Sequence, residues 1–392
     1  MKKLSVKDLD LRGKRVLVRV DFNVPVRNGR VMDDWRIERS LPTIRYLLER
    51  GARPILVSHL GRPKGKPDPE CVMDPVARRL EELLRAPVLK LDAAVGDKVE
   101  EAIAAFNEGV VLLENSRFYL GETKNDPEFS RQLASLADLY VDDAFAVAHR
   151  THATVVGVAE LLPAAAGLLM EEELDTLDKV RRSSERPFVA VLGGAKVSDK
   201  LGVIESLLEL ADTLLIGGAM CFTFFKALGY EIGGSLVEDL YLTEAKRLIN
   251  EAGEKIVLPV DVVAAAKIEE NGPIKVVKVE EFPTGLIGLD IGPEAVEEFK
   301  SYIAGAKTVF WNGPMGVFEI DAFAKGTEGV ARAVAESGAA SIVGGGDVVA
   351  AVRKFGLESQ MSFISTGGGA SLEYVEGTAL PGVVVLPEKG SL

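Results

Sequence analysis

Long apolar runs are missing from this chain of 392 residues, and several residue types are scarce. No stretch of about 18 uninterrupted apolar residues occurs, so the sequence predicts no membrane-spanning helix. The N-terminus, MKKLSVKDLD, has two lysines without an apolar segment behind them, which argues against a signal peptide and favours a cytoplasmic protein. Cys71 and Cys221 are the only cysteines, and neither has ligand-like spacing. We therefore expect buried free thiols and no disulfide or nucleophile.

Excess positive charge is also missing. The chain has 46 Lys and Arg against 59 Asp and Glu, a net charge of −13. This balance argues against a nucleic-acid-binding protein, because affinity for a phosphate backbone requires a basic face. The composition is otherwise typical of a folded globular protein, with 47% hydrophobic and 27% charged residues. The length favours about two or three domains.

Two nucleotide-binding fingerprints are absent as well. The chain contains neither GxxxxGKS/T nor GxGxxG. The first absence excludes a P-loop, and the second argues against a nicotinamide-dependent dehydrogenase on paired Rossmann-like lobes. No short repeat or Ser/Gly linker occurs, so we expect lobes that are coupled by a structured element and move as hinged bodies.

Short runs rich in Val, Ile and Leu alternate with amphipathic segments of helical spacing. This alternation predicts βαβ units and parallel sheets, the α/β class. The predicted helices lie at 38–50, 74–85, 127–137, 199–210, 239–252, 293–304 and 326–337. A further helix is expected within 163–187, with its acids early and its bases late, as the helix dipole favours. We interpret it as a connection between two lobes; the alternative is an ordinary helix inside one larger sheet.

The ends of the predicted strands differ between the two halves of the chain. In the first half they carry charged clusters, at 16–23, 54–62, 110–118 and 139–145. In the second half they mostly carry glycine, at 188–196, 213–219, 286–292, 309–316, 341–347 and 363–369. Open parallel sheets bind ligands at the carboxyl ends of their strands. One lobe should therefore bind a small anion, the other should hold phosphates on backbone N–H groups, and the pair indicates a kinase with two substrates.

Arginines gather at the charged strand ends of the first half. Guanidinium groups bind carboxylates and phosphates bidentately and stay charged at any working pH. Any one of them alone would more often be a solvated charge, but four at successive strand ends favour an anion site. The candidates are Arg36, Arg62, Arg117 and Arg150, with Asp21, Asn23 and His59 beside them. His149 and His152 remain ambiguous, and a local hydrogen-bonding role is favoured for His152.

Lysines and acids accompany the glycine loops of the second half. Lys196 and Lys200 in GGAKVSDK would share one face if a helix begins there, and two lysines suit a triphosphate. Asp347, after GGG, is the best candidate for a Mg²⁺ carboxylate, with capping of the next helix as the alternative. Glu319 is a candidate for ribose hydroxyls, with an exposed loop acid as the alternative.

Taken together, these motifs resemble the phosphoglycerate kinase family across essentially the whole chain. They include VRVDFNVP, SHLGRPKG, LLENSRF, LGGAKVSDK, WNGPMGVFE, GGGDV and STGGGASLE. The resemblance implies two Rossmann-like lobes with parallel sheets, 1–168 and 187–376, joined by a helix at 169–186, with the tail 377–392 packed back on the first lobe. It implies reversible transfer between 1,3-bisphosphoglycerate with MgADP and 3-phosphoglycerate with MgATP, by hinge closure. Its partners would be small molecules, without nucleic acid or membrane, and it would act as a monomer.

The resemblance also assigns residues by motif. The 3-phosphoglycerate site would be Asp21, Asn23, Arg36, His59, Arg62, Arg117 and Arg150. The nucleotide site would be Gly194, Ala195, Lys196, Lys200, Gly217, Gly288, Asn312, Glu319, Gly345, Gly346, Asp347 and Val348, with Asp347 on the metal. The catalytic groups would be Arg36, Lys196, Gly346 and Gly368, the last within the 367–369 loop of backbone N–H groups. No general acid or base is expected, because the leaving carboxylate needs no proton and the work is positioning and charge stabilisation.

Several positions depart from the family pattern. Val348 stands where Ser or Thr is usual, which would remove one hydroxyl contact to a nucleotide phosphate. Cys221 and Phe222 lie near the expected base pocket, and Ala146 with Val147 replaces a more usual glycine and small polar residue. DVVAAAK (261–267) lacks an Asp that is often found there. These departures motivate an alternative, a catalytically weak member that acts as a nucleotide-binding or interaction module.

Overall fold

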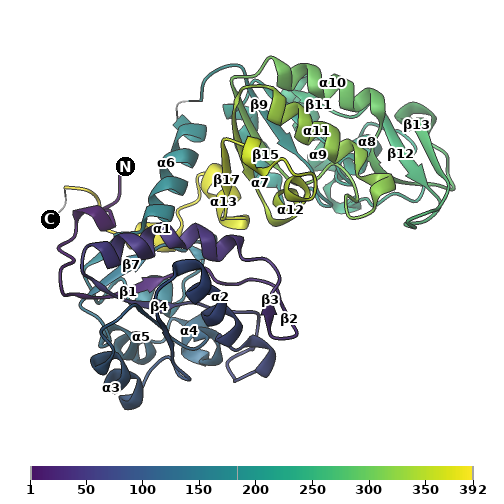
Figure 1. The fold of residues 1–392 in the computed structure, drawn as a ribbon. Helices are drawn as coiled ribbons and strands as arrows, with labels where there is room; N and C mark the ends of the chain where they lie inside the picture. The colour runs from purple at the N-terminus through teal and green to yellow at the C-terminus, as the bar shows by residue number, and fades with distance from the viewer. Residues whose placement is uncertain (1, 183, 391–392) are drawn as a thin grey trace. The chain divides into compact units, whose positions relative to one another are not determined.

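The computed structural model describes residues 2–182 and 184–390, which form two compact units (Figure 1). The first unit holds the residues up to Asp175 together with those from Ala379 onward, and the second unit holds Thr176–Thr378. The two chain ends meet within the first unit, where Leu4 N–H donates to the Pro387 carbonyl at 2.8 Å.

The first unit is built on a six-stranded parallel sheet in the order β5-β6-β4-β1-β7-β8. Its strands are β1 Arg15–Arg19, β4 Arg53–Val57, β5 Val88–Lys90, β6 Val110–Leu112, β7 Leu139–Asp142 and β8 Ala164–Ala166. Its helices include α1 Trp35–Glu49, α2 Asp74–Leu84, α3 Asp97–Ala105, α4 Leu120–Lys124, α5 Pro127–Ala134 and α14 Pro381–Val384. A hairpin of β2 Val26–Arg27 and β3 Arg30–Val31 is added. Central β1 is apolar and buried along most of its length, as expected for a strand covered on both faces.

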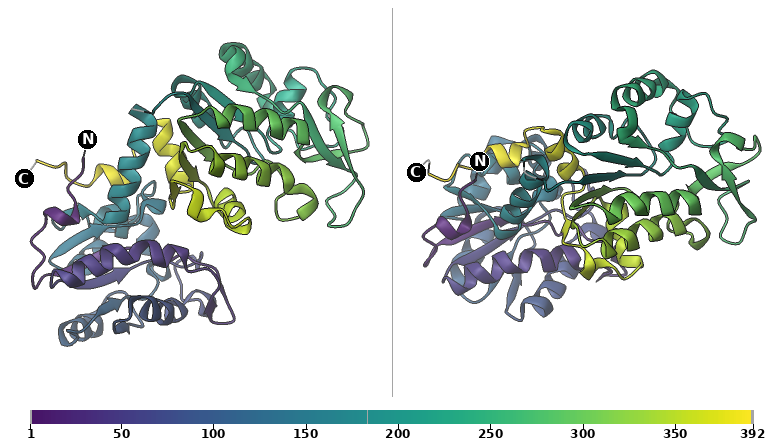
Figure 2. Two further views of the ribbon diagram at one scale, coloured as in Figure 1. Left: turned by 45° about the horizontal axis from the view of Figure 1, so that its top comes forward. Right: turned by 90° about the horizontal axis from the view of Figure 1, so that it is seen from above.

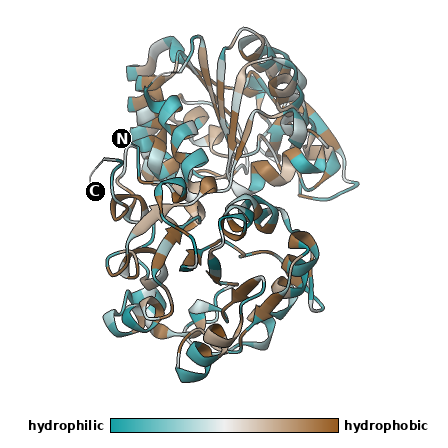
Figure 3. Ribbon diagram, turned by 60° about the vertical axis from the view of Figure 1, so that its left-hand side comes forward, coloured by the Kyte–Doolittle hydropathy of each residue, from teal (hydrophilic) through white to brown (hydrophobic). Residues whose placement is uncertain are grey.

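The second unit has a six-stranded parallel sheet in the order β11-β10-β9-β15-β16-β17. The strands are β9 Phe188–Leu192, β10 Thr213–Ile216, β11 Ile256–Val257, β15 Thr308–Asn312, β16 Ala340–Gly344 and β17 Phe363–Ser365. The helices include α7 Leu201–Leu210, α8 Cys221–Ala227, α9 Leu242–Ala252, α10 Pro293–Ala304, α11 Lys325–Glu336, α12 Gly346–Lys354 and α13 Gly369–Glu376. Helices α10 and α11 lie side by side in both views of Figure 2. Brown, apolar residues line the strands in Figure 3, and teal residues lie on outward helix faces.

The run 286–292 does not belong to a parallel sheet, contrary to its grouping with the glycine-ended runs. It forms β14 Ile287–Ile291, which pairs antiparallel with β12 Asp261–Ala265. On its other side β12 pairs antiparallel with β13 Ile274–Lys278. A short link suffices to join antiparallel strands, whereas parallel strands need a long crossover. The resulting three-stranded sheet lies at one end of the second unit (Figure 1).

The predicted connecting helix is observed as α6 Leu168–Arg182, and the division between the units falls within it. Its predicted end at residue 186 is wrong, because Glu185 and Arg186 are not helical. The residue before a proline is disfavoured in the α region, and Pro187 follows. The carbonyl of Glu185 instead accepts the Thr308 hydroxyl at 2.9 Å.

Candidate substrate and nucleotide sites

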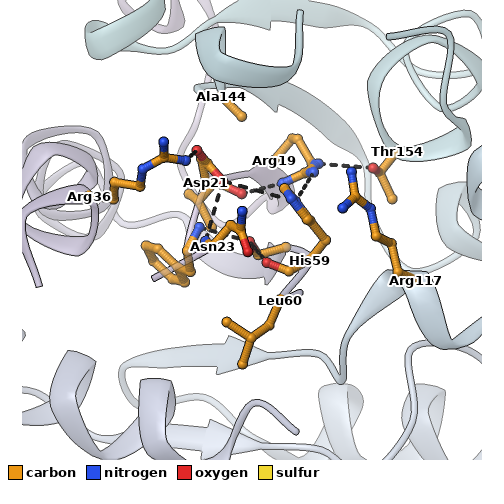
Figure 4. Close-up of polar contacts among 12 residues, drawn as sticks. Arg19, Asp21, Asn23, Arg36, His59, Leu60, Arg117, Ala144 and Thr154 are labelled. Atoms are coloured by element: carbon orange, nitrogen blue, oxygen red, sulfur yellow. Dashed lines mark hydrogen bonds and ion pairs between the residues drawn. The ribbon is translucent and has the colours of Figure 1, made fainter. Parts of the chain in front are cut away.

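A polar cluster lies beyond the carboxyl end of β1 in the first unit (Figure 4). Asp21 follows the strand, and Arg36 from the first turn of α1 forms an ion pair with it. Asn23 Oδ1 accepts the Gly61 N–H at 2.9 Å, and His59 Nδ1 lies 4.0 Å from Asp21 Oδ1. The structure therefore brings four of the predicted substrate residues, Asp21, Asn23, Arg36 and His59, into one cluster.

The remaining predicted arginines extend this cluster of positive charge. Arg117 is half-buried and donates to the Gly61 carbonyl at 2.9 Å. Burial lowers its pKa, and the nearby charges of Arg19 and Arg62 lower it further. Arg62 and Arg150 are exposed. The cations around Arg117 form a site which a multiply charged anion would stabilise.

The histidines of this cluster are held neutral. Burial lowers the pKa of His59 far below its usual value, and the charges of Arg19, Arg117 and Arg36 act in the same direction. Burial also lowers the pKa of His152 to about 4, helped by Arg117. His152 Nδ1 lies 3.7 Å from Glu122 Oε1. At neutral pH neither imidazole carries the additional proton that a general acid would donate.

Sequence reasoning missed a buried polar chain behind this cluster. Arg19 is fully buried at the end of β1, and its Nε donates to Thr154 Oγ1 at 2.9 Å. Thr154 Oγ1 in turn donates to Glu122 Oε1 at 2.7 Å, and Glu122 is also fully buried. The available signal was an arginine inside the otherwise apolar run VLVRV, since buried charge is costly unless it is paired.

The glycine-ended strands of the second unit surround a pocket of about 520 Å³. Of the predicted nucleotide residues, Gly194, Ala195, Gly288, Glu319 and Asp347 line it. Gly218 lines it where Gly217 was predicted. Cys221 and Phe222 form part of the wall. The wall also contains apolar side chains that were not predicted: Leu236, Ile268, Ile287, Leu289 and Val317. A mostly apolar pocket with a few polar groups is typical of a small-molecule site.

Lys196 and Lys200 do not share a helix face, contrary to the prediction. Helix α7 begins only at Leu201, so the two lysines lie in the preceding loop. Lys196 is exposed, whereas Lys200 is buried and its Nζ donates to both the carbonyl and Oδ1 of Asn312. Burial lowers the pKa of Lys200 to about 8. The two amines therefore have different chemistry.

Another contact that sequence reasoning missed fixes the loop that carries Lys196. Glu238 accepts the Ser198 hydroxyl at 2.6 Å and the Ser198 N–H at 3.0 Å. The segment before Glu238 contributes Gly234 and Leu236 to the pocket. One acidic side chain thus ties the lysine loop to the pocket wall.

The predicted phosphate loops precede α12 and α13. Gly345 has φ +112°, a conformation that favours glycine, and it is the N-cap of α12. Asp347 is exposed in the first turn of that helix, and no side-chain cap is observed, so the alternative role as a helix cap is not seen. Val348 is fully buried and does not line the pocket. Gly346 and Gly368 have open space around them.

Comparisons with known proteins identify a family for this chain. The family described as phosphoglycerate kinase matches residues 6–378. The phosphoglycerate kinase of Rubrobacter xylanophilus is 70% identical over 389 residues, which cover 99% of each chain. The chain belongs to the phosphoglycerate kinase family. The phosphoglycerate kinase of Moorella thermoacetica is 58% identical over 393 residues, which cover 99% of this chain and 100% of the other.

Solved structures of phosphoglycerate kinases share the fold. The enzyme from Coxiella burnetii has a TM-score of 0.86 at 41% identity, covering 98% of each chain. The enzyme from Pyrococcus horikoshii also has a TM-score of 0.86, at 33% identity and the same coverage. The two parallel sheets with helices are therefore those of a phosphoglycerate kinase, an ATP-dependent phosphotransferase. In the described residues, no helix is long and apolar enough to cross a membrane.

Gly288→Ala should damage the apolar pocket of the second unit. An added Cβ would lie 1.9 Å from Phe222 Cζ, and edge contacts with Phe225 and Phe282 restrict the ring. Overpacking of this kind costs about 1–3 kcal/mol, and displacement of Phe222 would reshape the wall. We expect lower stability in urea and weaker ATP binding in calorimetry, with 3-phosphoglycerate binding unchanged.

A matched control for this substitution lies three residues away. A Cβ at Gly285 would meet nothing within 4 Å, and its φ is not in the left-handed region. Gly285→Ala should therefore leave both stability and ATP affinity as in the wild type. Equal ATP affinity in the two variants would contradict the role given to Phe222.

Proposed function

We propose that this protein catalyses reversible phosphoryl transfer between 1,3-bisphosphoglycerate and MgADP, giving 3-phosphoglycerate and MgATP, as a glycolytic phosphoglycerate kinase. The observation that carries the proposal is the pairing of two sites of different chemistry. One unit presents an arginine cluster around Asp21 and His59, and the other presents glycine loops and lysines around an apolar pocket. Such a pair suits an anionic acyl substrate and a nucleotide.

In the first unit, the arginine cluster binds 3-phosphoglycerate. Arg62, Arg117 and Arg150 supply charge for its phosphate, while Asp21 and Asn23 bind its polar groups. Arg36 is half-exposed, with its ion pair to Asp21 fixing one side of the guanidinium. Its other N–H groups would reach the transferring phosphoryl group, where they stabilise charge on the equatorial oxygens.

In the second unit, the pocket receives the base and the loops receive the phosphates. Phe222 and the neighbouring aliphatic side chains cover the base, and Glu319 at the rim accepts ribose hydroxyls. Lys196, Lys200 and the backbone N–H groups before α12 and α13 bind the phosphates. Asp347 fits a Mg²⁺ that arrives with the nucleotide, because an exposed carboxylate beside a phosphate loop is a usual protein ligand of this ion.

The test is a coupled assay with 3-phosphoglycerate, MgATP and glyceraldehyde-3-phosphate dehydrogenase. Wild-type protein should support steady oxidation of NADH. Pure, folded protein without turnover would favour the alternative function, a nucleotide-binding or interaction module. Nucleotide binding in calorimetry without turnover would establish that alternative directly.

The state of the protein in the cell belongs to the same proposal. We expect a cytoplasmic monomer, which light scattering coupled to size exclusion would test at about 42 kDa. The two substrates would bind to separate units, so we predict that the units close on each other during turnover. Small-angle scattering should show compaction when both substrates are added, and an unchanged radius of gyration would contradict it.

Lys200 predicts proton uptake on nucleotide binding. Its pKa of about 8 leaves the free amine largely neutral above that pH, whereas bound phosphates favour the charged form and raise the pKa. We expect uptake near pH 8.5 and little near pH 6.5, where the amine is already charged. Calorimetry of ATP binding in two buffers of different ionisation enthalpy measures it.

Two variants sharpen this experiment. Lys200→Met should abolish the uptake at pH 8.5, because the titrating amine is gone. Lys226→Met should retain it, since that lysine is exposed and forms an ion pair with Asp239. Equal uptake in Lys200→Met and wild type would assign the proton to another group.

A further inference from the structure

The arginine inside β1 constrains a ring of the substrate site. Arg19 Nη2 lies 3.0 Å from His59 Nδ1 (Figure 4). A guanidinium has only donors, so this hydrogen bond requires Nδ1 to be the acceptor. His59 Nδ1 then carries no proton, and the proton of the neutral ring lies on Nε2.

The other contacts of Arg19 prevent it from turning away. Its Nε donates to Thr154 Oγ1 at 2.9 Å, and its Nη1 donates to the Val20 carbonyl. The Thr154 hydroxyl has one proton, which it gives to Glu122 at 2.7 Å, so its oxygen must accept from Arg19. The direction of every hydrogen bond from Glu122 to His59 is therefore determined.

Burial makes this arrangement costly to change. Arg19, Thr154 and Glu122 are fully buried, and 4% of the His59 side chain is exposed. The groups that face His59 include the cations Arg19, Arg36 and Arg117, together with His152 and the carboxylate of Asp21. A proton on Nδ1 would place two donors against each other at 3.0 Å and lose a buried hydrogen bond.

We propose that Arg19 is a positioning residue of the substrate site, which holds His59 as a neutral imidazole with its proton on Nε2. In the described part of the chain Nε2 makes no hydrogen bond, so it is left to donate to an anionic substrate. The step to substrate rests on the proposed binding of 3-phosphoglycerate to this cluster. Arg19 acts through His59 and need not touch the substrate.

The test uses the three histidines of the chain, which give three imidazole patterns in ¹⁵N-detected NMR of the whole protein. His59→Gln identifies the signal of His59. In the wild type we expect the neutral Nε2–H form to persist from about pH 8 down to about pH 5, below the usual range of a histidine. A proton on Nδ1 at pH 7 would overturn the proposal, whether or not any variant folds.

Arg19→Lys separates the effect of the planar guanidinium geometry from the effect of the positive charge. An ammonium keeps the charge but cannot donate to Thr154, Val20 and His59 in the same planar geometry. We expect both tautomers of His59 to appear and KM for 3-phosphoglycerate to rise roughly tenfold, with KM for MgATP unchanged. An unchanged tautomer and an unchanged KM would overturn the proposal.

The matched control is Arg15→Lys in the same strand. Arg15 lies at the surface and pairs with Asp138 at 3.0 Å, so neither readout should move. Titration of the wild type with 3-phosphoglycerate distinguishes the assignment of the substrate site from the control of the His59 ring by Arg19. If the signal of His59 shifts, the substrate site is supported. If the signal stays in place in the Nε2–H form, the substrate assignment fails while the control of the ring by Arg19 stands.

Discussion

Arg36→Ala is expected to lower kcat by about 10³-fold or more, as loss of an arginine finger does in other phosphoryl transfers. Arg36 projects from the first turn of α1, and the ion pair with Asp21 fixes its orientation. The phosphoryl group gains negative charge on its equatorial oxygens at the transition state, so a preorganised guanidinium acts mainly on kcat. Steady-state kinetics in the coupled assay measure the effect, with urea unfolding to confirm that the variant is folded.

Two further variants serve as comparisons for Arg36→Ala. Arg36→Lys retains the positive charge but not the planar guanidinium group with its paired N–H donors, so it should recover only part of kcat. Arg39→Ala removes an arginine one turn further along α1, whose partner Glu172 is exposed, and it should behave as the wild type. If Arg36→Ala changes only KM for 3-phosphoglycerate, the residue binds substrate and does not stabilise the transition state.

Lys196→Ala is expected to lower turnover by about 10²- to 10³-fold, the usual cost of removing one group that stabilises developing charge. The lysine is exposed, so its loss should leave the fold intact. Its loop is held by Glu238, which accepts two hydrogen bonds from Ser198 and whose negative charge also acts on Lys196. The coupled assay, with ATP affinity measured separately by calorimetry, divides the effect between binding and transfer.

Lys226→Ala is the matched control, because this lysine of the same unit is exposed and is paired with Asp239. It should leave turnover unchanged. Lys200→Ala should differ from both, since it empties a buried position and removes the donor to the carbonyl and Oδ1 of Asn312. Full turnover in Lys196→Ala would move the role of phosphate neutraliser from Lys196 to Lys200.

Much of the fold follows from local patterns in the sequence. The predicted helices at 74–85 and 293–304 are α2 and α10 within one residue, because amphipathic spacing and N-terminal prolines are local signals. The parallel strands are found in apolar runs without alternation, as both faces are covered. Arg36, His59 and Arg117 could be proposed as a site because strand ends in parallel sheets meet at one edge.

Several failures of sequence reasoning came from a pairing between distant segments. The run that forms β14 looks like the other glycine-ended strands, and only its partner β12 makes it antiparallel. Lys196 and Lys200 are similar in sequence, yet only Lys200 is enclosed by packing against Asn312. Ser198 and Glu238 are 40 residues apart, and nothing local indicates their contact.

The sequence by itself determined the α/β class, the positions of the helices and parallel strands, and the family, because these depend on residue type and spacing along the chain. The tertiary structure decided the direction of β14, the burial of Lys200 and the chain from Glu122 through Arg19 to His59. Those features depend on which distant groups approach within hydrogen-bond distance and on how much water packing excludes. Protonation of a side chain responds to both, so the chemistry of the site is set only when the chain is folded.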